Sequence, residues 1–269
     1  MKDNIRKTFE AQPKTLVRNV LIALFLIFLM YWSSTAIEYA GIHQGGTNVA
    51  RNIMRGLINP DRNLLFSTTA QGVPYLILET MAIALLGTLI GAILAIPVSF
   101  LASRNLMPKV ISGFTMLFLA AVRTFPAFVY GLMFIRVAGP GPFAGVLTLA
   151  LTSIGMISKL YIESIEDLDR GIIESLDAAG CNTLEKVRYG ILPQLMTNFL
   201  STTIYRFEIN VKNASILGLV GAGGLGAPLL FAMSAYRWSE VGAILIGLVV
   251  LVLIVEQASS MIRTKLARG

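Results

Sequence analysis

Two apolar runs, "VLIALFLIFLMYW" at residues 20–32 and "GAILIGLVVLVLIV" at residues 242–255, decide the fold class of this 269-residue chain. A bilayer core of about 30 Å needs about 20 apolar residues in a helix, and each run lies within a stretch of that length. The whole chain is 55% hydrophobic and only 14% charged, whereas soluble domains carry roughly 25% charged residues. The composition therefore predicts an all-α protein that crosses a membrane several times.

Outward from these two runs, six stretches are predicted to span the membrane. They are approximately residues 17–37, 75–98, 113–135, 143–160, 195–217 and 240–258. If the N-terminus is inside, the inner segments hold fourteen Lys and Arg residues and the outer segments five. The positive-inside rule then places both termini in the cytoplasm. The first run is expected to be an uncleaved span, and residues 1–269 to form a single transmembrane domain.

The sequence lacks residues that several classes of function require. One cysteine, Cys181, and one histidine, His43, exclude a disulfide framework and make a histidine-rich metal site or a His-based triad unlikely within one chain. No G-x4-G-K-[ST] motif occurs, so the sequence predicts no ATP site in this chain. We predict no catalytic or metal-binding residue and no nucleic-acid partner; a polytopic membrane enzyme and an unenergised channel are the competing classes.

Residues 161–193 are charged and amphipathic, which predicts helices at the cytoplasmic surface. Within them begins "ESLDAAGCNTLEKVRYGILPQL", residues 174–195. Gly180 permits a tight left-handed turn between two short helices, and Pro193 can begin the following helix because its missing N–H costs nothing there. The segment is predicted to form a projecting helix–turn–helix; the alternative is an ordinary pair of surface helices.

This loop resembles the EAA loop of ABC importer permeases, whose pattern is E-A-A-x3-G-x9-I-x-L-P. Glu174, Gly180 and the pair Leu192-Pro193 match, whereas Ser175, Leu176 and Gly190 depart from the pattern. The wider chain, from about residue 75 onward, is similar to phosphonate permeases of the PhnE type. The most specific stretch is "YRFEINVKNASILGLVGAGGLG" at residues 205–226.

The resemblance implies a type I ABC importer permease in the bacterial cytoplasmic (inner) membrane, carrying phosphonate or a related phosphorus oxyanion. Phosphite or hypophosphite is the close alternative, and a methionine-type permease a more distant one. The implied partners are a second copy of the chain, two ATPase subunits that carry ATP and Mg, an extracytoplasmic binding protein and the lipid bilayer. The implied ATPase-docking residues are Glu174, Asp177, Ala178, Ala179, Gly180, Leu192 and Pro193.

Three basic residues, Arg123, Arg206 and Lys212, fall inside predicted spans. Ionisable groups at this depth are costly and usually face a partner or a water-filled path. The hypothesis is that the substrate path includes Arg123, Thr124, Arg206, Asn210 and Asn213. The alternative is structural: Arg206, Glu208 and Lys212 neutralise one another, and the asparagines bond between helices. Pro126 is predicted to kink or open the third span.

Overall fold

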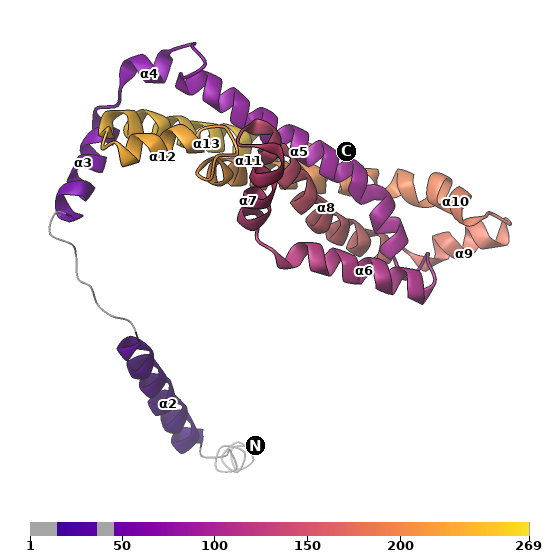
Figure 1. Cartoon of the computed structure of the whole chain (residues 1–269). Coiled ribbons are helices and arrows are strands. Elements are labelled where there is room, and N and C mark those ends of the chain that lie inside the picture. Colours follow the sequence, from indigo (N-terminus) through magenta and orange to yellow (C-terminus); the bar gives the residue numbers. More distant parts are fainter. Residues whose placement is uncertain (1–14, 37–45, 269) are drawn as a thin grey trace. The chain divides into compact units, whose positions relative to one another are not determined.

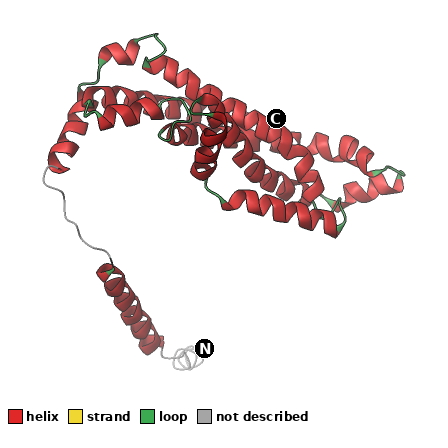
Figure 2. Ribbon diagram, in the orientation of Figure 1, coloured by secondary structure: helices red, strands yellow, loops and turns green. Residues whose placement is uncertain are grey.

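The computed structural model describes residues 15–36 and 46–268, which contain helices and no strand (Figure 2). The all-α prediction is therefore confirmed. Residues Met1–Ala50 and Arg51–Gly269 form separate compact units. In the first unit, α2 (Thr15–Thr35) carries the apolar run, and its stretch Val17–Thr35 is long and apolar enough to cross a bilayer.

The second unit holds the remaining helices of the described chain. Their bounds are α3 (Gly46–Ile58, which begins before the unit boundary), α4 (Arg62–Phe66), α5 (Val73–Ala102), α6 (Lys109–Thr124), α7 (Ala127–Ala138), α8 (Pro142–Glu166), α9 (Arg170–Ala178), α10 (Thr183–Glu185), the π-helical turn η1 (Lys186–Ile191), α11 (Leu192–Gly218), α12 (Gly226–Ser234) and α13 (Trp238–Arg268). Figure 1 shows α9 and α10 at one end of the bundle made by α5, α8, α11 and α13, with α4 and α12 at the other end.

Length and apolarity identify four membrane-crossing helices among the described residues: α2, α5, α8 and α13. The pair α6 and α7 makes a fifth if the two are counted as one broken span. Helix α11 occupies the predicted span 195–217 and has 27 residues, about 40 Å at 1.5 Å per residue. It is not counted because its middle is rich in charged and amide side chains, so the six predicted spans become four or five by these criteria.

The third predicted span is bent sharply at Pro126, as the sequence predicted. Helix α6 ends at Thr124, α7 begins at Ala127, and their axes differ by 85°. Pro126 has no N–H to donate to the carbonyl of Val122, four residues earlier. The hydroxyl of Tyr130 donates to that carbonyl instead, at 3.0 Å. The bend therefore keeps this carbonyl hydrogen-bonded, and residues 113–135 form two helices rather than one.

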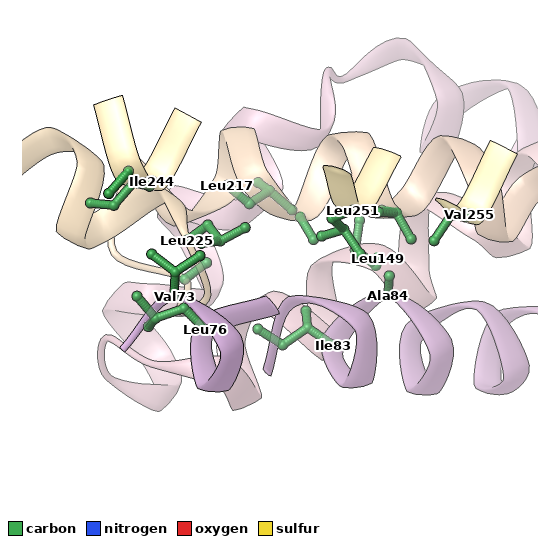
Figure 3. Close-up of a cluster of buried hydrophobic side chains, with 14 of the residues drawn as sticks. Val73, Leu76, Ile83, Ala84, Leu149, Leu217, Leu225, Ile244, Leu251 and Val255 are labelled. Carbon is green, nitrogen blue, oxygen red and sulfur yellow. The ribbon is translucent and has the colours of Figure 1, made fainter. Parts of the chain in front are cut away.

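Helices α5 and α8 pack at close range in the centre of the second unit. A Cβ at Gly87 of α5 would lie 2.6 Å from the Cβ of Leu149 in α8, so only glycine permits this approach. Small residues of this kind are how membrane helices come together without a hydrophobic driving force. The apolar core continues from this contact to α11 and α13, where Leu217 and Leu251 join Leu149 (Figure 3).

The glycine-rich stretch at residues 218–226 is a bend between α11 and α12. Gly221, Gly223 and Gly224 all have positive φ, and the backbone N–H of Leu225 donates to the Thr80 hydroxyl at 3.0 Å. A Cβ at Gly223 would lie 2.9 Å from the backbone of Pro142. The glycines therefore let the ends of α11, α12 and α8 meet closely.

Candidate functional site

The loop between α8 and α11 forms a helical hairpin that turns at Gly180. Gly180 has φ +79°, the left-handed conformation predicted for it. The backbone N–H of Cys181 donates to the carbonyl of Leu176 at 3.0 Å, and that of Gly180 to Asp177 at 2.9 Å. These two bonds are a Schellman motif, which ends α9 and satisfies its last carbonyls.

The second arm of the hairpin is fixed by its own caps. The backbone N–H of Asn182 donates to Glu185 at 2.7 Å, and the N–H of Glu185 donates to the side chain of Asn182 at 3.0 Å. This reciprocal pair has the arrangement of a capping box. Lys186 forms an ion pair with Asp177 across the turn. Pro193 is the second residue of α11. Since α11 continues from η1 without a break, only the turn predicted at Gly180 is confirmed.

The predicted docking residues share one property, which is that most of them are exposed at the end of the bundle. Exposed members are Glu174, Asp177, Ala178, Ala179, Gly180 and Pro193, while Leu192 is half-buried. Gly190, which departs from the family pattern, is buried, and a Cβ there would overlap the side chain of Leu176. The hairpin therefore presents a compact polar tip whose shape depends on two glycines.

Arg206 lies at the middle of α11 and points into the contact with α8. It is the fifteenth of the 27 residues of the helix and is 8% exposed. Its Nε donates to the hydroxyl of Ser153 at 3.2 Å, and its Nη2 to the hydroxyl of Thr152 at 3.4 Å. Within the described ranges no carboxylate lies at ion-pair distance from Arg206. The expected pairing of Arg206 with Glu208 is therefore wrong, because the two side chains leave α11 in nearly opposite directions.

Asn210 joins three helices one turn further along α11. Its Nδ2 donates to the hydroxyls of Thr88 in α5 and Ser153 in α8, both at 2.8 Å. The side chain is fully buried and its Oδ1 has no hydrogen-bond partner. These are the interhelical bonds that the structural alternative expects. Ser153 accepts from both Arg206 and Asn210, so the two side chains belong to one polar cluster at mid-helix depth.

On the other side of α11, four charged residues alternate in sign. Glu208 forms ion pairs with Lys212 at 3.3 Å and with Arg263 of α13 at 3.2 Å. Lys212 also forms an ion pair with Glu256 of α13, at 3.6 Å. The pair Glu208–Lys212 is the i, i+4 pair that the sequence predicted. Glu256 and Arg263 were not expected as partners, although an acidic residue that ends the apolar run at 242–255 is a signal for one.

The remaining predicted path residues lie apart from this cluster. Arg123 and Thr124 are exposed at the end of α6, and the Thr124 hydroxyl donates to the Ala120 carbonyl at 2.9 Å. Asn213 is half-buried. Arg123 and Arg206 nevertheless approach the same turn of α8 from different helices, since the Arg123 stem lies against Gly155 and Arg206 reaches Thr152. Sequence reasoning missed Thr152 and Ser153, whose only signal was their place in a span rich in small polar residues.

The broken span α6–α7, the exposed hairpin at Gly180 and the polar middle of α11 are the features to set beside known proteins. The family of binding-protein-dependent transport system inner membrane components matches residues 87–263. The chain belongs to this family, and it is therefore an integral membrane component of a transport system and not an enzyme.

Two permeases with known names are similar to this chain over most of its length. The phosphite transport system permease protein PtxC of Stutzerimonas stutzeri is 34% identical over 188 residues, which is 70% of this chain and 68% of that protein. The phosphate-import permease protein PhnE of Mycolicibacterium smegmatis is 34% identical over 189 residues, 70% of this chain but only 36% of that protein. The chain thus aligns with about a third of the mycobacterial protein.

A solved structure supports the same fold at lower sequence similarity. A chain of the MetNI methionine ABC transporter in an inward-facing conformation superposes with a TM-score of 0.63 over 71% of this chain and 94% of that chain. The sequence identity is 19%, so this likeness concerns the fold alone.

Proposed function

We propose that this chain is the membrane-spanning subunit of an ABC importer and forms the path for a small phosphorus oxyanion such as phosphonate or phosphite. The observation that carries the proposal is Arg206, a cation in mid-helix that is held by two hydroxyls and has no carboxylate partner among the described residues. The names of the similar proteins, which are permeases for phosphite and phosphate, support the same substrate class.

The chemistry of Arg206 suits such a substrate. A guanidinium group presents a planar set of donors that matches a tetrahedral oxyanion in two-bond geometry. Two neutral hydroxyls orient the group without cancelling its charge. A positive charge at this depth lowers the barrier for an anion crossing a low-dielectric region. Arg123, Thr124, Asn210 and Asn213 remain predicted members of the path.

The proposed assembly follows from the family. It contains a second copy of the chain, two ATPase subunits that bind ATP and Mg, and an extracytoplasmic protein that delivers the substrate. Both termini are proposed to lie in the cytoplasm of a bacterium, and residues 161–193 to form the coupling helices of a single transmembrane domain. The exposed, doubly capped hairpin at Gly180 supports a docking role, because a rigid tip transmits movement to the membrane helices.

Substitution of Arg206 tests the substrate path. The assembled transporter, reconstituted in liposomes, should import methylphosphonate and phosphite, and Arg206→Gln should reduce the uptake rate about tenfold or more, the effect of losing a charge-assisted hydrogen bond. Arg136→Gln is the matched control, since Arg136 is exposed at the end of α7. Unchanged uptake by a folded Arg206→Gln transporter removes Arg206 from the path, unchanged uptake by Arg123→Gln as well rejects the path, and preferential uptake of methionine rejects the substrate class.

Substitution of Gly180 tests the docking role. At Gly180 and at Gly113 of α6 an added Cβ meets no atom within 4 Å, but only Gly180 has positive φ. Gly180→Val should therefore strain the turn by about 1–2 kcal/mol, and ATP hydrolysis should no longer drive uptake. Gly113→Val should leave the ratio of transport to hydrolysis unchanged. Normal coupling in Gly180→Val would remove the hairpin from the mechanism.

A further inference from the structure

A cavity of about 340 Å³ lies between α6, α8 and the turn that joins α5 to α6. Its charged lining residues are Arg104, Arg123, Lys159, Glu163 and Glu166. It shares no lining residue with the cluster around Arg206 and Asn210. Apolar side chains of α6 close the wall between the charged groups, among them Leu119. The cavity is therefore a second polar region of the bundle, separate from the polar cluster around Arg206 and Asn210.

The two carboxylates of the cavity are already engaged. Glu163 pairs with Lys159 at 3.4 Å, one turn away on α8. Glu166 accepts the backbone N–H of Arg104 at 2.9 Å, which ties the inner end of α8 to the α5–α6 turn. Neither carboxylate is within ion-pair distance of an arginine side chain in the described part of the chain. Both arginine charges thus remain uncompensated.

The arginine side chains converge on this cavity from opposite ends of α6. Within the described part of the chain, the hydrogen-bond partner of the Arg104 Nη2 is the sulfur of Met116, at 3.7 Å. The stem of Arg123 crosses α8 at Gly155, where an added Cβ would lie 2.8 Å from the Arg123 Cγ. Gly155 and Lys159 are spaced i, i+4 on one face of α8. The glycine therefore makes room for Arg123 beside the lysine.

We propose that this cavity is a binding site for a phosphorus oxyanion group, held by Arg104 and Arg123 with Lys159 beside them. Two arginines that lack carboxylate partners provide the paired donors that a tetrahedral oxyanion accepts. The group has two sources: the transported anion, or the phosphate of an anionic phospholipid. The site does not require the proposed role of Arg206.

Binding to the intact transporter in phosphatidylcholine nanodiscs tests this site. One arm measures methylphosphonate and inorganic phosphate by titration calorimetry, and the other counts phosphatidylglycerol adducts by native mass spectrometry. We expect the double variant Arg104→Gln/Arg123→Gln to bind one of the two kinds of probe more weakly, by about tenfold for each arginine. The double variant Arg136→Gln/Lys265→Gln is the control, because it removes two exposed positive charges elsewhere.

The outcomes separate the sources. Weaker binding of the free anions alone assigns the site to the transported substrate, and fewer lipid adducts alone assign it to the phospholipid. Binding by the glutamine variant that equals the wild-type level in both arms overturns the proposal, as does the absence of binding in both arms. If the glutamine variant does not fold, the double variant Arg104→Lys/Arg123→Lys takes its place in both arms. It keeps the two charges and loses the paired donors of each guanidinium group. Unchanged affinity of this variant for both kinds of probe would overturn the site.

These measurements are independent of the substrate-path test. Arg206→Gln leaves every residue of the cavity in place, so its uptake rate reports on the path alone. Normal uptake by Arg206→Gln together with weakened binding in the Arg104/Arg123 variant would reject the role of Arg206 and retain the cavity site.

Discussion

The two faces of α11 treat charge in opposite ways. On the face toward α13, Glu208 is held by Lys212 and Arg263, so a carboxylate and its cations neutralise each other. On the face toward α8, Arg206 is held by hydroxyls of Ser153 and Thr152, which carry no charge. Arg206 and Glu208 are two positions apart in the sequence, which places them about 200° apart around the helix. One helix thus carries a compensated cluster and an uncompensated cation at similar depth.

This difference separates stability from function. A compensated cluster within a membrane ties helices together, and its loss leaves unpaired charges in a low-dielectric region. A cation held by neutral hydroxyls keeps its charge, and the proposed function assigns that charge to the passage of an anion. The comparison predicts that substitutions on the α13 face change the unfolding free energy, whereas substitution of Arg206 changes transport.

The largest effect on stability is expected for Glu208→Gln. The substitution removes the carboxylate that two cations share, and the Nε of Arg263 already lacks a hydrogen-bond partner among the described residues. Breaking a buried ion pair from one side costs about 3 kcal/mol. Thermal unfolding of the purified chain in detergent should show a clearly lower midpoint. A midpoint equal to that of the wild type would mean that the cluster is not stabilising.

An intermediate effect is expected for Asn210→Leu, which keeps the number and branching of the side-chain heavy atoms and removes two interhelical hydrogen bonds. Interhelical bonds in membrane proteins contribute about 1 kcal/mol. Asn213→Leu is the matched control on the same helix, since Asn213 is half-buried and makes no side-chain hydrogen bond among the described residues. Equal unfolding midpoints for the two variants would contradict an interhelical role for Asn210.

The smallest effect is expected for Glu256→Gln. Its side chain is 56% exposed and its distance to Lys212 is 3.6 Å, so the pair contributes about 0–1 kcal/mol. The chemical change is the same as in Glu208→Gln, and the unfolding midpoints of the two variants are therefore directly comparable. If Glu256→Gln lowers the unfolding midpoint more than Glu208→Gln does, Glu256 contributes more to stability than Glu208, which contradicts the expected order.

Local backbone chemistry was predictable from the sequence, and partner choice was not. Pro126 and Gly180 act through their own φ angles and hydrogen bonds, so the 85° bend and the left-handed turn followed from residue type. The pair Glu208–Lys212 followed from helical spacing. The partners of Arg206 did not, because α11 is polar on both faces and periodicity gives no sign of which face meets α8.

The criteria of length and apolarity recover only four or five of the six predicted spans for the same reason. Polar side chains in α11 lower its apolarity below that of α5 or α13, although its length suffices to cross a bilayer. Mean hydropathy counts every polar side chain of a helix as if it were exposed, whereas α11 buries Arg206, Glu208 and Asn210 against neighbouring helices. Glu256 and Arg263 were missed because their importance depends on which turn of α13 lies beside Glu208.

The hydroxyl of Tyr130, which replaces the backbone donor lost at Pro126, has an evolutionary consequence. A single nucleotide change converts a tyrosine codon into a phenylalanine codon, and it removes the hydroxyl while leaving the aromatic ring in place. The carbonyl of Val122 would then seek another donor, and the angle between α6 and α7 would relax. Selection can therefore adjust the geometry of this broken span through one side-chain oxygen, without altering its length, its hydrophobicity or the proline that creates the bend.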